Sequence, residues 1–281
     1  MKYFDAHTHV QFAAFEEDTN EVIKRAKEVE VGMNVVGTQY DTSVAAVALA
    51  EQHECVWATV GLHPIHTSKS FHDKKELGDG GKEFTSRGEY FHIWKYEKLA
   101  QSSKVIAIGE CGLDYYRLDE ATKKIQTENF VAQIELANSL KKPLMLHIRP
   151  SAAKAMEGKN AYAEVLEILK AHAKVRGNVH FFAGDWAVAK QFLDLGFTLS
   201  FTGVITFTHD YDEVVKNTPL DMLLVETDAP YVTPAPHRGK RNEPSYIPEI
   251  VKKMAQIKGI LEDTAQQQLL KNVRRVFNIE L

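Results

Sequence analysis

The chain has 281 residues, of which 44% are hydrophobic and 26% are charged. These proportions are typical of a globular protein with a large buried core and exclude a disordered or fibrous chain. The net charge of −4 gives no overall attraction to nucleic acid, so binding of that kind would need a local basic patch. Two cysteines cannot form a disulfide framework, and no apolar stretch approaches the roughly 20 residues that cross a bilayer. We therefore expect a cytoplasmic protein without membrane contacts.

Short apolar runs recur along the chain and alternate with stretches of helical spacing. Such runs are typical of strands that are buried on both faces of a parallel sheet. In the clearest helical stretch, residues 126–140, one face carries the side chains of Phe130, Ile134, Ala137 and Leu140. The runs that we expect to form strands cover residues 2–6, 34–37, 56–60, 105–108, 144–146, 178–179, 198–201 and 222–225.

Eight strand and helix units within 281 residues match the size of a (β/α)8 TIM barrel of the α/β class. We expect a single TIM-barrel domain over residues 1–281. One stretch interrupts the alternation, from about residue 68 to residue 96, and it is rich in glycine and charge. We expect an inserted surface loop there, which is either passive or a lid over the active face. A smaller irregular segment covers residues 151–160.

Five of the apolar runs stop at residues that bind metal ions or move protons. The carboxyl ends of the strands of such a barrel meet on one face, so these side chains would converge there. Each alone fits a hydrogen-bonded core residue, but unpaired buried polar groups are costly, and all of them at strand ends need a common reason. We therefore expect a dinuclear metal site at the C-terminal ends of the strands, with these ligands: His7, His9, Glu110, His147, His180 and Asp228.

The spacing and chemistry of these residues predict how two ions would be shared. His7 and His9 stand two residues apart, so both face the same side of a strand and would bind the first ion. Glu110 would bridge the ions, because a carboxylate offers two oxygens and its charge offsets part of that of two cations. His147 and His180 would complete the shell of the second ion.

Asp228 would bind the first ion and face the water shared by the two metals. There it would act as general base and orient the bridging hydroxide that this water becomes. Asp228 and Glu110 are thus the expected catalytic residues. Imidazole ligands favour Zn²⁺, Mn²⁺ or Co²⁺, whereas carboxylates and phosphate substrates suit Mg²⁺. We expect two divalent ions as cofactors, and Mg, Mn and Zn all remain open.

Several longer motifs resemble the signatures of the TatD family of metal-dependent deoxyribonucleases. They are residues 4–9, 61–64, 109–116 and 226–231, with support from residues 143–149 and 238–244. The resemblance covers nearly the whole chain and implies an amidohydrolase-type barrel, a two-metal site at the ligands above and 3′-to-5′ exonuclease action on single-stranded DNA. The chain departs from the family at residues 180–184, where the usual His-Cys-Phe-Ser-Gly reads His-Phe-Phe-Ala-Gly, which affects local polarity and substrate preference.

Two-metal hydrolysis suits phosphodiesters, because the ions stabilise both the attacking and the leaving oxygen. Cations near the active face would pair with phosphate, and tyrosines there could stack on bases. We therefore expect single-stranded DNA or another phosphodiester as substrate, and no obligate protein partner. The residues expected to bind the substrate are His63, Arg149, Arg238, Lys240, Arg241 and Tyr115.

Two other functions fit the same features. A metal-dependent ester hydrolase, such as a D-aminoacyl-tRNA deacylase, would use the same ligands and the same hydroxide. A barrel that binds nucleic acid without turnover would also keep the ligands, although Asp228, the expected base, argues against it. The residues alone do not distinguish exonuclease from endonuclease action.

Overall fold

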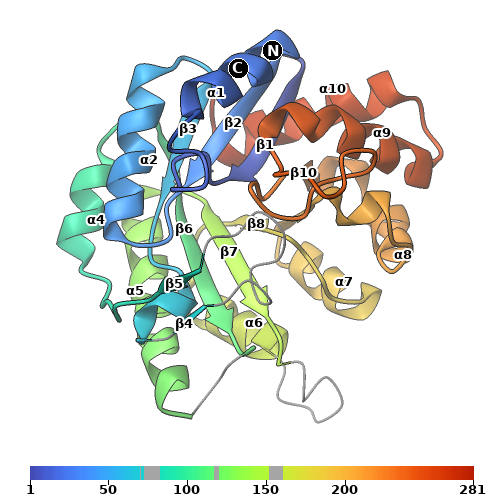
Figure 1. Ribbon diagram of the computed structural model, residues 1–281. Helices are drawn as coiled ribbons and strands as arrows, with labels where there is room; N and C mark the ends of the chain where they lie inside the picture. The colour runs from blue at the N-terminus through green and yellow to red at the C-terminus, as the bar shows by residue number, and fades with distance from the viewer. Residues whose placement is uncertain (70, 73–82, 117–119, 152–160) are drawn as a thin grey trace.

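The described residues of the computed structural model are 1–69, 71–72, 83–116, 120–151 and 161–281. Within them, eight strands form one sheet in which every neighbouring pair is parallel. The sheet curves into a barrel with helices around it, which confirms the predicted (β/α)8 TIM barrel (Figure 1). In sheet order the strands are β1 (Tyr3–Thr8), β2 (Val31–Val36), β3 (Val56–Val60), β6 (Val105–Asp114), β7 (Leu144–Arg149), β8 (Gly177–Val179), β9 (Thr198–Phe201) and β10 (Leu223–Val225).

The first strand is joined to the chain that follows the last strand. The N–H of Asp228 donates to the carbonyl oxygen of His7 at 2.9 Å, and the N–H of His9 donates to the carbonyl oxygen of Ala229 at 2.8 Å. The buried carboxylate of Asp5 accepts the N–H of Thr227 at 2.9 Å. These bonds nearly close the barrel and bring residues from opposite ends of the sequence to one place.

The helices bury one face each against the barrel. In α5 the side chains of Phe130, Ile134 and Ala137 are fully buried, and Leu140 is partly buried against the same core, which confirms the predicted apolar face. None of the helices in the described residues is long and apolar enough to cross a membrane. The helices are α1 (Thr19–Glu28), α2 (Tyr40–Gln52), α4 (Ile93–Ala100), α5 (Glu120–Leu140), α6 (Ala161–His172), α7 (Trp186–Asp194), α8 (Asp212–Asn217), α9 (Ile247–Lys258) and α10 (Glu262–Phe277), with short 3-10 turns at η1 (Pro64–Thr67), η2 (Gly203–Thr206), η3 (Leu220–Met222) and η4 (Pro244–Tyr246).

Strand β6 is longer than the sequence predicted, because it runs to Asp114 instead of ending at residue 108. Gly109 and Gly112 have φ angles of 150° and 144°, a region that residues with a side chain rarely adopt. A Cβ atom at Gly112 would collide with the carbonyl oxygen of His147 on β7, so glycine permits the close pairing of these strands. As a result Glu110 lies within a strand, at a shift in the register with β7, and its N–H donates to the carbonyl oxygen of Gly37 at 3.3 Å.

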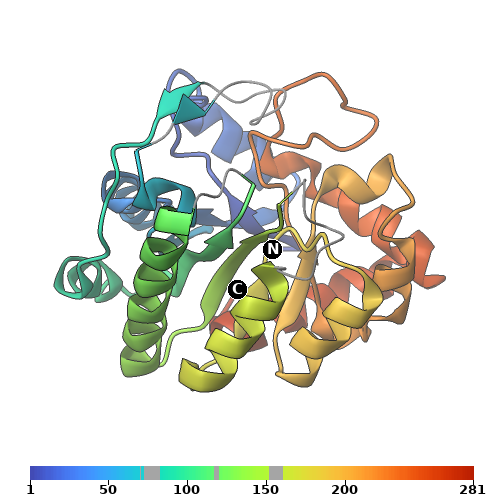
Figure 2. The same ribbon diagram turned by 90° about the horizontal axis from the view of Figure 1, so that it is seen from below.

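The predicted insertion at residues 68–96 contains two short antiparallel strands, β4 (Phe71–His72) and β5 (Phe84–Thr85), and the start of α4. Residues 73–82 of this insertion, and nearly all of the irregular segment at 151–160, lie outside the described residues. Figure 2 shows the β4 and β5 arrows and the orange segment after β10 at the same edge of the molecule. Both segments contribute to the wall of one cavity, through Glu83 and Thr85 and through residues 230–232.

Candidate metal centre

The six residues predicted as metal ligands meet at the C-terminal end of the barrel. Five of them line a cavity of about 710 Å³, and the sixth, His7, is completely buried directly behind it. They come from both ends and the middle of the sequence, and the parallel strands bring them together. His7 lies in β1, Glu110 in β6 and His147 in β7, while His9, His180 and Asp228 follow β1, β8 and β10.

Glu110 lies at the centre, and its two oxygens face different pairs of imidazoles. Its Oε2 is 3.4 Å from Nε2 of His7 and 3.9 Å from Nε2 of His9. Its Oε1 is 2.9 Å from Nδ1 of His147 and 3.0 Å from Nε2 of His180. A carboxylate with one oxygen toward each of two nitrogen pairs has the arrangement needed to bridge two cations.

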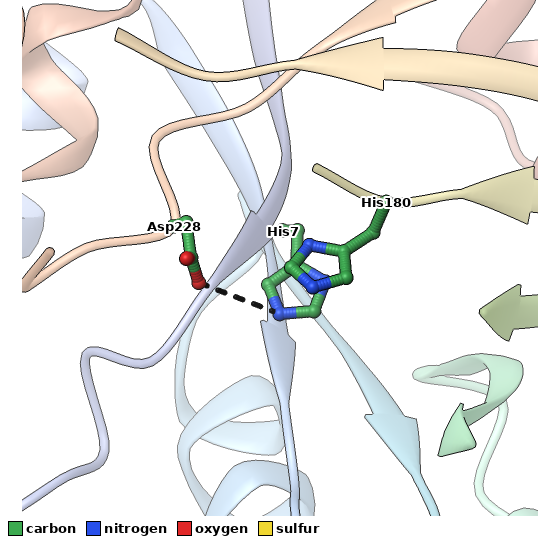
Figure 3. Close-up of side chains that lie close together, drawn as sticks. All are labelled: His7, His180 and Asp228. Carbon is green, nitrogen blue, oxygen red and sulfur yellow. Dashed lines mark ion pairs between the residues drawn. The ribbon is translucent and has the colours of Figure 1, made fainter. Parts of the chain in front are cut away.

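Asp228 adds a second carboxylate to one of these pairs. Its Oδ1 is 3.4 Å from Nε2 of His9 and 3.8 Å from Nε2 of His7. Figure 3 shows Asp228 directed at the His7 ring, which stacks on the ring of His180 with their centroids 3.8 Å apart. The backbone of Asp228 is left-handed, with φ at 53°, and this conformation is held by the bond from its N–H to His7. The constrained turn after β10 therefore aims the carboxylate at β1.

The donor atoms at this end of the barrel suit a divalent cation. Nε2 of His7 and Nε2 of His9 approach to 3.2 Å. The carbonyl oxygen of Val36 can only accept, so the Nδ1 of His9 that lies 2.8 Å from it carries the proton, and Nε2 of the neutral ring has a free lone pair. Two buried imidazole nitrogens and two carboxylates converging on one point match the ligands of Zn²⁺ and Mn²⁺. The residues present thus fit a metal ion.

Burial and mutual charge set the protonation of the metal-free centre. Burial, together with the charge of His180, lowers the pKa of His7 to about 3, so that ring stays neutral at pH 7. Burial alone would raise the pKa of Glu110, but the surrounding imidazoles outweigh it and hold the pKa well below its ordinary value. Burial would lower the pKa of His180, but the charges of Glu110 and Glu226 raise it well above its ordinary value. The bridge is therefore ionised and ready to bind cations.

Two acidic residues at the centre were not singled out from the sequence. Oδ2 of Asp114 lies 2.9 Å from Nε2 of His147, and Oε1 of Glu226 lies 3.2 Å from Nδ1 of His180. They lie within the motifs at residues 109–116 and 226–231. Asp114 stands four residues after Glu110, and Glu226 stands two residues before Asp228. This even spacing from predicted ligands is the signal that could have marked them as candidates.

Comparison with known proteins identifies the family of this barrel. A family model described as TatD related DNase matches residues 4–278. The chain belongs to the TatD family. It is 34% identical over 281 residues to the uncharacterized metal-dependent hydrolase YabD of Bacillus subtilis, with 98% of this chain and 99% of the relative covered.

Two further TatD relatives bear on activity and on fold. A protein of Erwinia tasmaniensis named 3′-5′ ssDNA/RNA exonuclease TatD is 33% identical over 287 residues and covers 98% of this chain and 100% of its own length. The crystal structure of YJJV, a TatD homolog of Escherichia coli K12, has a TM-score of 0.81 and 25% identity, with 99% of both chains covered. The resemblance drawn from the motifs is thereby confirmed, and the chain is a TatD-family metal-dependent hydrolase.

Two of the residues predicted to bind substrate lie in the cavity of this TatD protein. His63 and Arg149 line its wall. Nε2 of His63 is 3.3 Å from Oε1 of Glu110, beside the second imidazole pair. The guanidinium of Arg149 lies 3.9 Å from the ring centre of Tyr116. His63 and Arg149 thus share the cavity wall with five of the six predicted ligands.

The other four predicted substrate residues are not part of this cavity wall: Tyr115, Arg238, Lys240 and Arg241. The hydroxyl of Tyr115 donates to Glu164 on α6 at 2.8 Å, and the ring is buried. Arg241 donates to Asp18 and to the carbonyl oxygen of Ala14, both at 2.6 Å. Arg238 donates to the carbonyl oxygen of Thr233 at 2.8 Å, and Lys240 is exposed. In the structure, Tyr115, Arg238 and Arg241 thus have partners within the fold.

Proposed function

We propose that this TatD protein is a metal-dependent deoxyribonuclease that removes nucleotides from the 3′ end of single-stranded DNA. The observation that carries the proposal is the division of the two Glu110 oxygens between two pairs of imidazoles, which fits a pair of divalent ions. Such ions lower the pKa of a coordinated water and neutralise charge on the attacking and leaving oxygens of a phosphodiester. The relative from Erwinia tasmaniensis, whose name describes a 3′-5′ ssDNA/RNA exonuclease, supports the choice of substrate.

Asp228 is the residue that accepts the proton of the attacking water. Its carboxylate lines the cavity, faces His7 and His9 and is held by the turn after β10. A general base must lie within reach of the water that it activates, and this position at the edge of one imidazole pair meets the condition.

His63 is the residue that donates a hydrogen bond to the phosphate. Its Nδ1 accepts the N–H of Ile65 at 3.1 Å, so Nε2 carries the proton of the neutral ring. Burial, together with the charge of His147, lowers the pKa of His63 to about 4, and the ring stays neutral at pH 7. Arg149 supplies the positive charge at the cavity wall, and its planar guanidinium suits phosphate oxygens.

The test is cleavage of single strands carrying a label at the 5′ or the 3′ end, in Mg²⁺, Mn²⁺ or Zn²⁺. We expect stepwise shortening from the 3′ end, and we expect Asp228→Asn to keep the fold and lose about 10²–10⁴-fold in rate. Asp194→Asn is the control, because Asp194 is an exposed carboxylate at the far end of α7. Absence of cleavage with every metal, or full activity of Asp228→Asn, would refute the proposal.

Ester hydrolysis is the second candidate, favoured by the apolar part of the cavity wall. Phe12, Ile148, Phe181 and Val232 all line it, and apolar side chains of this kind fit an aminoacyl group. A D-aminoacyl-tRNA substrate separates the two candidates. Deacylation without any cleavage of DNA would replace the first proposal by the second.

A further inference from the structure

We propose that Asp114 and Glu226 are positioning residues that orient His147 and His180 for one of the two ions, the one bound by Glu110, His147 and His180. The inference rests on the metal centre of the proposed function, but it does not depend on DNA being the substrate. Neither carboxylate is among the six predicted ligands. Each lies behind an imidazole and points at the ring nitrogen that faces away from Glu110.

Glu226 fixes the ring of His180. Its side chain is completely buried, its Oε1 accepts the N–H of Phe181 at 2.5 Å, and its Oε2 accepts the hydroxyl of Ser200 at 2.6 Å. Because an ionised carboxylate only accepts, His180 presents its Nδ1–H to Oε1 at 3.2 Å. The opposite ring nitrogen, Nε2, then points toward Glu110, at 3.0 Å from its Oε1, and is the nitrogen that would bind the ion once the ion displaces its proton.

Asp114 acts on His147 in the same way, but through the opposite ring nitrogen. Its Oδ2 lies 2.9 Å from Nε2 of His147, and its Oδ1 accepts the N–H of Tyr116 at 2.9 Å. The backbone of Asp114 is held by two bonds with the amide of Gln126. His147 therefore presents Nε2–H to Asp114 and turns Nδ1 toward Glu110, at 2.9 Å from Oε1.

The imidazoles of the other pair have no such support. Nδ1 of His9 donates to the neutral carbonyl oxygen of Val36. Nδ1 of His7 is buried and has no hydrogen-bond partner among the residues that the structure describes. A carboxylate behind an imidazole fixes its orientation and makes it a stronger ligand. Asp114 and Glu226 thus serve one ion of the pair and leave the other unaffected.

The test is metal binding by Asp114→Asn and Glu226→Gln, measured by calorimetric titration of the metal-free protein with Mn²⁺ and by metal content after gel filtration. We expect the native protein to bind two ions, and each variant to lose about 10–100-fold in affinity for one ion with the other unchanged. Glu243→Gln is the matched control, because it removes a buried carboxylate that pairs with Arg25 outside the centre. Co²⁺ absorption reports the geometry of the affected ion directly.

Ser200→Ala is a second variant, which weakens the support of Glu226 without removing its charge. Ser200→Ala should lower the affinity for the same ion, but less than Glu226→Gln does. It also keeps the inference testable if Glu226→Gln does not fold. Equal weakening of both ions, or binding as tight as in the native protein, would overturn the inference. A native protein that binds no divalent ion would instead overturn the proposed function, so the two failures are distinguishable.

Discussion

Glu110 shows how much a single residue can determine at this centre. One buried carboxylate lies within 4 Å of all four histidines that were predicted as ligands, and each of its oxygens faces a different pair of them. Glu110→Gln keeps the shape of the side chain but removes the negative charge between the two proposed cations. We expect this variant to lose both ions, a greater defect than the about 10–100-fold loss typical of residues behind the ligands. Metal content after gel filtration measures it, with circular dichroism as the check on folding, and a variant that retains both ions would contradict the bridging role.

Arg149 and Arg241 were predicted to share one role, and the structure separates them. Arg149 lines the cavity, whereas Arg241 pairs with Asp18, bonds Ala14 and lies over the ring of Phe15. We expect Arg149→Ala to raise KM for single strands about tenfold, because one charge-assisted phosphate contact is lost. Arg241→Ala should leave KM unchanged and destabilise the fold by about 1 kcal/mol, or a Tm decrease of about 2–4 °C. The opposite pattern in steady-state kinetics and thermal melts would restore Arg241 as a substrate residue.

At the scale of elements, strand β6 positions the bridge, and Gly112 is the residue that permits its pairing with β7. Gly112→Ala forces a φ of 144° on a residue with a side chain and drives its Cβ into the carbonyl oxygen of His147. We expect a loss of about 2–4 kcal/mol in the free energy of unfolding, because strain and displacement of the backbone add together. Urea unfolding measures the loss, and Gly239→Ala is the control for backbone strain alone, because its φ is 81° and a Cβ there meets nothing within 4 Å. Equal stability of the two variants would show that the pairing tolerates a side chain.

The strands were predictable from the sequence because buried parallel strands are apolar throughout, and the apolar runs coincide with all eight strands of the barrel. The end of β6 was not predictable, because Gly109 and Gly112 look like residues that end a strand. Only their close contact with β7 shows why the strand continues through them. The meeting of the six proposed ligands was predictable because each follows an apolar run. Even spacing marks Asp114 and Glu226 only as candidates. Which imidazole each one meets depends on the register between neighbouring strands, and spacing along the sequence does not contain that register.

At the scale of the whole molecule, the metal centre depends on closure of the barrel. The bond from Asp228 to His7 connects positions near the two ends of the sequence, and Phe277 of α10 packs on Phe4 of β1 with ring centroids 6.3 Å apart. Ions that bind this assembled centre, and not the unfolded chain, stabilise the native state by mass action. Thermal stability therefore reports the occupancy of the centre without any substrate.

The pH dependence of that stabilisation follows from the raised pKa values of His147 and His180. Above pH 6.5, the ordinary pKa of histidine, the lowered pKa of His7 leaves its ring neutral in both the folded and the unfolded chain. His7 therefore adds no pH dependence to the stability in that range. In the metal-free protein the raised pKa values of His147 and His180 stabilise the fold fully below pH 6.5. This contribution is lost as the pH rises through the pKa values of the folded protein. A bound ion must displace the same protons, so its affinity rises over that range.

We therefore expect the Tm difference between metal-loaded and metal-free protein to widen as the pH rises above 6.5. With metal at about 100 times its Kd, the stabilisation is about 2.7 kcal/mol, which shifts Tm by about 5–10 °C in a chain of this size. Melting curves with Mn²⁺ and with a chelator, at several pH values, measure the difference. Glu110→Gln should show no shift at any pH because both ions lose their bridge, and a shift in the native protein that does not change with pH would contradict the displacement of protons from these two histidines.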